Sequence, residues 1–129
     1  MAQKSKRYGR LLKVQSLVEA HHKAELEYMK GQLFSCQEET RELFSLMEKD
    51  SAFNFWNASF LAKRLHHNAK FEKNLQGKIA QQKQVVCEAS SRSKRLEDKC
   101  KEIQSIEKQK QFSNMLEEYI INKIGKTSA

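Results

Sequence analysis

Proline is absent from this chain of 129 residues, and its four glycines are scattered singly without forming a turn cluster. A proline inside a helix removes a backbone donor and clashes with the preceding turn, so its absence permits very long helices. Apolar residues recur every three or four positions almost from end to end, which is the spacing of one helix face. The sequence therefore predicts an all-α fold built from long helices.

Patterns that carry catalysis are also missing. The chain has no glycine-rich phosphate loop, no nucleophile elbow and no strand pattern that could support either. The pairs His21-His22 and His66-His67 are candidate metal ligands by residue type. However, neighbouring side chains on a helix point about 100° apart, and no carboxylate or cysteine completes a tetrahedral set. We therefore expect no enzyme, no metal or cofactor, and no small-molecule substrate.

The net charge of +8 is concentrated at the start of the chain. Five basic residues precede the first acid, Glu19: Lys4, Lys6, Arg7, Arg10 and Lys13. Elsewhere acids and bases interleave, which is typical of the solvated face of a coiled coil. The basic start is either a solvated face as well or an electrostatic docking site. Nucleic acid is not the favoured partner, because the interleaved charge and the apolar spacing indicate helix packing.

The predicted first helix runs from about residue 6 to 48, and the second from about residue 58 to 124. A seam, meaning the line of residues through which two helices pack, can be followed along the first helix. It passes through Tyr8, Leu11, Gln15, Val18, His22, Leu26, Met29, Leu33, Cys36, Thr40, Leu43 and Met47. Two consecutive spacings of four around His22 predict a stutter, which locally relaxes a supercoil.

The apolar rhythm stops over residues 49–57, where Asp50, Ser51, Asn54 and Asn57 are good helix N-caps. We place the chain reversal there, the alternative being one uninterrupted helix. The prediction is a single antiparallel two-helix coiled-coil hairpin over residues 1–129, with the second helix longer than the first. Folding the chain about residue 52 places Cys36 opposite residue 68 and His22 opposite residue 82.

In this register the second helix extends beyond the end of the first. Its seam is clearest at Leu75, Ile79, Gln82, Val86, Ala89, Ser93, Leu96, Cys100 and Ile103. The first helix ends opposite about residue 98, so we expect everything after Cys100 to lack a partner within the chain. That overhang is nevertheless apolar at Ile103, Ile106, Phe112, Met115, Leu116, Tyr119, Ile120, Ile121 and Ile124. Such a helix is expected to dimerise, to dock on another protein, or to fold only on binding.

Three cysteines without C-x-x-C spacing predict free thiols that fill the seam in a reducing compartment. No apolar run approaches the roughly 18 residues that span a bilayer, and the start lacks the apolar core of a secretory signal. The basic, amphipathic start also has features of a mitochondrial transit sequence, although its apolar pattern continues past it. We expect a cytoplasmic protein.

Large side chains gather at the proposed hairpin tip, at Phe53, Phe55, Trp56, Phe60 and Leu61. A two-helix tip has few neighbours that could bury so many rings. They either fold over the turn and cap the seam, or they form an exposed docking patch.

A short, proline-free, basic helical hairpin with a tryptophan at its turn resembles the FliJ family, the stalk proteins of the flagellar type III export apparatus, and their injectisome counterparts. The resemblance rests on this design and on two stretches. One is Asn54-Phe55-Trp56-Asn57, and the other is a basic, Gln-rich coil, Ser93-Lys94-Arg95-Leu96-Glu97 followed by Lys108-Gln109-Lys110-Gln111-Phe112. The chain is somewhat shorter than is usual for that family.

The resemblance implies a non-enzymatic stalk that enters or docks on the hexameric export ATPase and promotes its assembly and activity. Its further partners would be the membrane export gate and the export chaperones, with peripheral association at the membrane. The ATPase end would comprise Lys6, Arg7, Arg10, Phe112, Met115, Leu116, Tyr119 and Ile120, and the gate end the tip residues. The alternative is a generic coiled-coil scaffold or tether that self-associates through its C-terminal helix.

Overall fold

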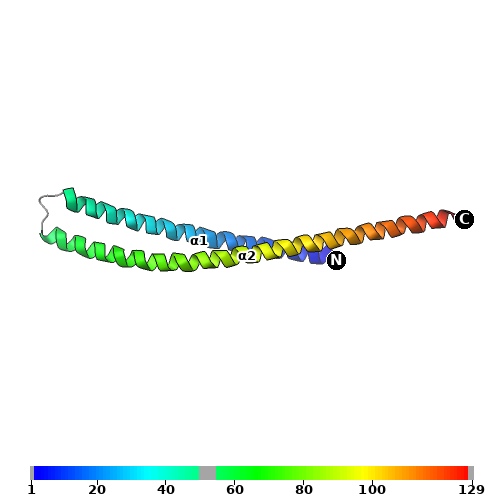
Figure 1. Cartoon of the computed structure of the whole chain (residues 1–129), viewed down its shortest axis with the longest axis horizontal. Coiled ribbons are helices and arrows are strands. Elements are labelled where there is room, and N and C mark those ends of the chain that lie inside the picture. Colours follow the sequence, from blue (N-terminus) through cyan, green and yellow to red (C-terminus); the bar gives the residue numbers. More distant parts are fainter. Residues whose placement is uncertain (1, 50–54, 128–129) are drawn as a thin grey trace. The chain divides into compact units, whose positions relative to one another are not determined.

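The computed structural model describes residues 2–49 and 55–127, which form two helices, α1 (Ala2–Lys49) and α2 (Phe55–Thr127) (Figure 1). The two helices pack against each other and α2 is the longer, which confirms the predicted all-α hairpin. Helix α1 starts at Ala2 rather than near residue 6, and α2 starts at Phe55 rather than near residue 58. Neither helix has, within the described residues, a stretch long and apolar enough to cross a membrane.

Contacts divide the chain into two compact units, each with a segment of both helices. The hairpin unit comprises Glu19–Ala89, and the terminal unit comprises Met1–Val18 with Ser90–Ala129. Each unit is held by its own part of the seam, so the two are described separately.

In the hairpin unit, protected positions alternate at spacings of three and four on both helices. On α2 these positions are Leu61, Leu65, Asn68, Glu72, Leu75, Ile79, Gln82, Val86 and Ala89. Two hydrogen bonds fix the antiparallel register. The Cys36 thiol donates to the Asn68 backbone oxygen over 3.5 Å, and Gln82 Nε2 donates to the His22 backbone oxygen over 3.0 Å. These pairs confirm the predicted register, because they lie where folding about residue 52 placed them.

The predicted stutter in α1 is wrong. The more protected positions are Leu12 and Glu19, whereas Leu11 and Val18 are exposed. With Leu12 and Glu19 in the seam, the spacing alternates regularly through His22. The α2 seam keeps an unbroken heptad, and a stutter in α1 alone would rotate its seam away from α2. Glu19 tolerates this place because its carboxylate pairs with Lys23 Nζ at 3.0 Å, one turn along the helix.

In the terminal unit the α2 seam continues through Ser93, Leu96, Cys100 and Ile103, as predicted. Ile103 is only 8% exposed. The expectation that everything after Cys100 lacks cover is therefore wrong for Ile103, and Glu107 is half-buried as well. The overhang begins one turn later than expected, and every side chain from residue 108 to 126 is exposed. The physical reason is that α1 starts at Ala2, about one turn earlier than predicted.

All three cysteines are free thiols. Cys36 and Cys100 are buried in the seam, which confirms the prediction for those two. The prediction is wrong for Cys87, which is exposed because the seam passes through its neighbour Val86.

Candidate functional site

Among the described side chains, the largest collection of exposed apolar ones lies at the end of α2, in the terminal unit. We name it the C-terminal surface, comprising Ile106, Phe112, Met115, Leu116, Tyr119, Ile120, Ile121 and Ile124. Their exposed fractions run from 47% at Ile120 to 69% at Met115. Scattered exposed apolar residues need no explanation, whereas a concentration of them makes this stretch the candidate interaction site.

The net charge of the protein belongs entirely to the same unit. Residues 1–18 and 90–129 hold 14 of the 24 basic and 6 of the 16 acidic residues, a balance of +8. Residues 19–89 hold ten of each and balance to zero. The terminal unit is thus a strongly basic body with an apolar surface, and the hairpin unit is electrically neutral.

The side chains of the predicted ATPase end all belong to the terminal unit and are all exposed. Lys6, Arg7 and Arg10 lie on the first three turns of α1. The apolar members, Phe112, Met115, Leu116, Tyr119 and Ile120, lie on α2 beyond its last protected position, Glu107. The basic and apolar groups therefore occupy separate stretches of one unit, rather than a single mixed patch.

The predicted hairpin tip is described only in part. Phe53 lies outside the described residues, and for Phe55 and Trp56 only the helical backbone is described. Phe60 is 68% exposed, whereas Leu61 is 8% exposed and belongs to the seam. Among the described side chains at this end, Phe60 on α2 is exposed, and so are Phe44, Leu46 and Met47 on the last turns of α1.

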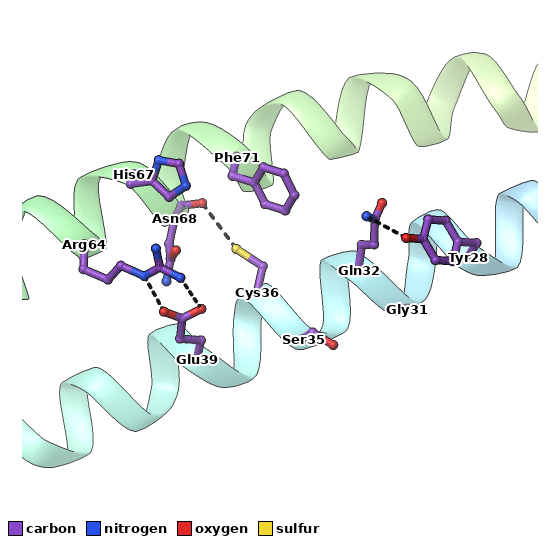
Figure 2. Close-up of a pocket in the computed structure, with 10 residues that line it drawn as sticks. All are labelled: Tyr28, Gly31, Gln32, Ser35, Cys36, Glu39, Arg64, His67, Asn68 and Phe71. Carbon is purple, nitrogen blue, oxygen red and sulfur yellow. Dashed lines mark hydrogen bonds and ion pairs between the residues drawn. The ribbon is translucent and has the colours of Figure 1, made fainter.

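The hairpin unit also contains an open groove of about 600 Å³ between the helices, which the sequence did not lead us to expect. It is lined from α1 by Tyr28, Gly31, Gln32, Ser35, Cys36 and Glu39, and from α2 by Arg64, His67, Asn68 and Phe71. Figure 2 shows the Phe71 ring projecting from α2 toward α1. The rings of His67 and Phe71 stack at 6.3 Å between centroids.

One ion pair crosses the groove. Arg64 Nε lies 2.5 Å from Glu39 Oε1, and Arg64 Nη2 lies 3.1 Å from Glu39 Oε2 (Figure 2). This two-pronged hydrogen bond lowers the pKa of Glu39 and raises that of Arg64, because it favours the charged form of each.

Two of the residues that line the groove, Asn68 and Cys36, are buried. The Asn68 amide Nδ2 donates to Thr40 Oγ1 over 3.4 Å, and its backbone oxygen accepts from Cys36. Burial raises the pKa of the Cys36 thiol, and the nearby carboxylates of Glu72 and Glu39 raise it further. A raised pKa disfavours the nucleophilic thiolate, and Cys36 is buried in the seam.

Neither the groove nor the histidine pairs form a metal centre. Among the described residues, no group of three or more His, Cys, Asp or Glu side chains could hold an ion. His21 instead pairs with Glu25 at 3.1 Å on its own helix, and the backbone oxygen of His22 accepts from Gln82.

Comparison of the chain with family models, with curated proteins and with solved structures finds no match in any of the three.

Proposed function

We propose that this protein is a non-enzymatic coiled-coil stalk or adaptor of a type III protein export apparatus. In this role it docks on, or enters, the hexameric export ATPase and promotes its assembly and activity. Its other partners are the membrane export gate and the export chaperones. The observation that supports the proposal best is the C-terminal surface, an exposed apolar helix that belongs to a unit with a net charge of +8.

Two physical arguments support docking as its role. Most of a helix's stability in proteins comes from packing an apolar face, so an exposed apolar helix gains from a partner. Clustered positive charge speeds encounter with an acidic surface and sets orientation, whereas the buried apolar side chains supply most of the affinity. A stalk that binds its partner through one of its own ends would use both the charge and the apolar side chains.

The experiment is to titrate the purified chain into the export ATPase of the organism that encodes it, and to measure ATP hydrolysis. We expect stimulation that saturates near one chain per hexamer. Reversing two exposed charges with Arg7→Glu and Arg10→Glu should remove it, since both lie in the basic unit. The matched control reverses Lys70→Glu and Lys73→Glu, two exposed positions on the neutral hairpin unit, and should leave stimulation intact.

The gate contact is tested at the other end of the hairpin. Phe60→Ala removes an exposed ring and is expected to weaken binding to the gate protein while sparing ATPase stimulation. If the wild-type chain changes neither the activity nor the assembly of the ATPase, the stalk proposal fails, and a self-associating scaffold replaces it.

A further inference from the structure

The start of α1 carries charge of one sign only. Residues 1–18 hold five basic residues and no acidic one, so they account for five of the eight net charges of the terminal unit. Because the first acid is Glu19, no base among them before Lys13 has an acid one turn away on its own helix, and Lys13 has none either. All five side chains are exposed: Lys4, Lys6, Arg7, Arg10 and Lys13.

Four apolar side chains of the same stretch are exposed as well. Leu17 is 71% exposed and Val14 is 59% exposed, and both Leu11 and Val18 are exposed to a smaller extent. An open hollow of about 460 Å³ lies beside Leu17, and its other lining residues are Leu12, Lys13 and Ser16. The stretch therefore offers apolar surface and positive charge together.

Both kinds of side chain lie on the side of α1 that faces away from its seam. The seam positions of this stretch are Ser5, Tyr8, Leu12, Gln15 and Glu19. At about 100° per residue, Arg10 and Leu17 lie opposite the seam and Val14 lies beside them. The other outer positions hold Gln3, Lys6, Arg7 and Lys13. We name the exposed basic and apolar residues between positions 4 and 18 the N-terminal face.

A membrane surface that contains anionic lipid fits this combination. On such a surface an amphipathic helix lies in the interface plane, with its apolar side chains at the boundary of the acyl layer. Lysine and arginine lay their apolar stems along that boundary while their charged ends reach the lipid phosphates. A cluster of four to eight bases on an amphipathic helix is typical of binding to anionic lipid.

The alternatives use only part of the face. A nucleic acid would match the positive charge, but Val14 and Leu17 would gain nothing against a phosphate backbone. Protein interfaces draw much of their affinity from tryptophan and tyrosine anchors, and the N-terminal face contains no aromatic residue.

We propose that the N-terminal face binds the surface of a membrane that contains anionic lipid, with Val14 and Leu17 inserted at the acyl boundary. The proposal goes beyond the export function, because it concerns another surface and a lipid rather than a protein. Lys6, Arg7 and Arg10 also belong to the proposed ATPase end. The test therefore alters only apolar residues and contains no ATPase, so that the two proposals can fail separately.

The probes are two kinds of vesicle, one of phosphatidylcholine alone and one that also contains about 30% phosphatidylserine. Flotation of the full-length chain at about 100 mM salt is expected to give at least about tenfold stronger partition into the anionic vesicles. The preference should shrink at about 500 mM salt, because salt screens the attraction between the bases and the lipid phosphates.

Matched substitutions locate the site without changing the charge. Val14→Ser with Leu17→Ser should weaken partition into the anionic vesicles about tenfold, because the inserted apolar area is lost. The control, Leu116→Ser with Ile120→Ser on the C-terminal surface, should leave partition unchanged. Circular dichroism checks that both variants remain helical.

Three results would overturn the proposal. They are equal partition into the two kinds of vesicle, partition that the Val14 and Leu17 substitutions leave unchanged, and partition that is lost in the Leu116 and Ile120 control instead. A DNA duplex of about 20 base pairs is the competing probe. If the duplex binds more tightly than the anionic vesicles, and the serine substitutions do not affect it, the bases serve a nucleic acid rather than a membrane.

Discussion

The guanidinium of Arg64 on α2 holds the carboxylate of Glu39 on α1 through two hydrogen bonds, which links the helices across the groove of the hairpin unit. The ion pairs of Arg41 with Glu38 and of Lys101 with Glu97 lie instead within single helices. An ion pair within one helix stabilises that helix alone, whereas the Glu39–Arg64 pair forms only when α1 and α2 pack in this register. Its planar, two-pronged geometry is specific to arginine and would be lost with lysine.

The first prediction concerns pH. Because the pKa of Glu39 is lowered in the folded protein, this group contributes stability above its ordinary pKa of 4.5 and loses it as the pH falls through the folded value. In urea unfolding, Glu39→Gln should therefore be less stable than the unmodified chain at a pH of about 7 and nearly equal at about 3. Both groups are exposed, so the difference is expected to be small.

A matched control separates the pair from a simple loss of charge. Glu38→Gln removes the neighbouring carboxylate, whose partner Arg41 lies on the same helix at 2.6 Å. If Glu38→Gln and Glu39→Gln lower the free energy of unfolding equally at neutral pH, the ion pair between the helices contributes no stability beyond that of one carboxylate charge.

The second prediction concerns the thiols. Cys87 is exposed, whereas Cys36 and Cys100 are buried in the seam. Reaction of the native protein with a chromogenic disulfide reagent should release one equivalent quickly and two more only on unfolding, because the buried thiols react through opening of the helices. Cys87→Ser should remove the fast phase alone. A fast phase of two or more equivalents in the native protein would contradict the packing described here.

The third prediction concerns glycine. Gly77 lies in the interior of α2 with a helical backbone, and a Cβ added there would meet no atom within 4 Å. Gly77→Ala should therefore raise the free energy of unfolding by about 0.5–1 kcal/mol, since alanine loses less backbone entropy and strains nothing. Gly125→Ala, two residues from the end of α2, is the control and should change stability much less. A destabilised Gly77→Ala protein would show that this position has a neighbour, such as a second chain.

The register could be predicted from the sequence because the α2 seam is an unbroken heptad that leaves one alignment with α1. The α1 seam was harder to assign. Leu11 and Leu12 are chemically identical, and Val18 is a better seam residue than Glu19 by hydrophobicity alone. Leu12 and Glu19 are the seam residues because an unbroken heptad outweighs the gain from burying the Val18 side chain. Glu19 keeps its carboxylate beside Lys23.

The groove was missed for a different reason. Its Glu39 and Arg64 belong to runs of mixed charge, which in a sequence indicate a solvated face. Only the register, applied to side chains next to the seam rather than in it, brings Glu39 level with Arg64 and Tyr28 to the same groove as Phe71. The C-terminal surface, by contrast, was visible at once, because helix length and apolar content are properties of the sequence itself.

The last prediction separates the seam from the C-terminal surface by their effects on stability. Leu75 is buried in the seam, so Leu75→Ala should lower the free energy of unfolding by about 2–3 kcal/mol through lost burial and a residual cavity. Leu116→Asp with Ile120→Asp replaces two side chains that are already about half exposed. It should change the free energy of unfolding by less than about 1 kcal/mol. Thermal and urea unfolding followed by circular dichroism measure both. If the double aspartate variant instead unfolds as readily as Leu75→Ala, the end of α2 is buried in the isolated protein. The C-terminal surface would then be a self-association interface, and the midpoint of unfolding would depend on protein concentration.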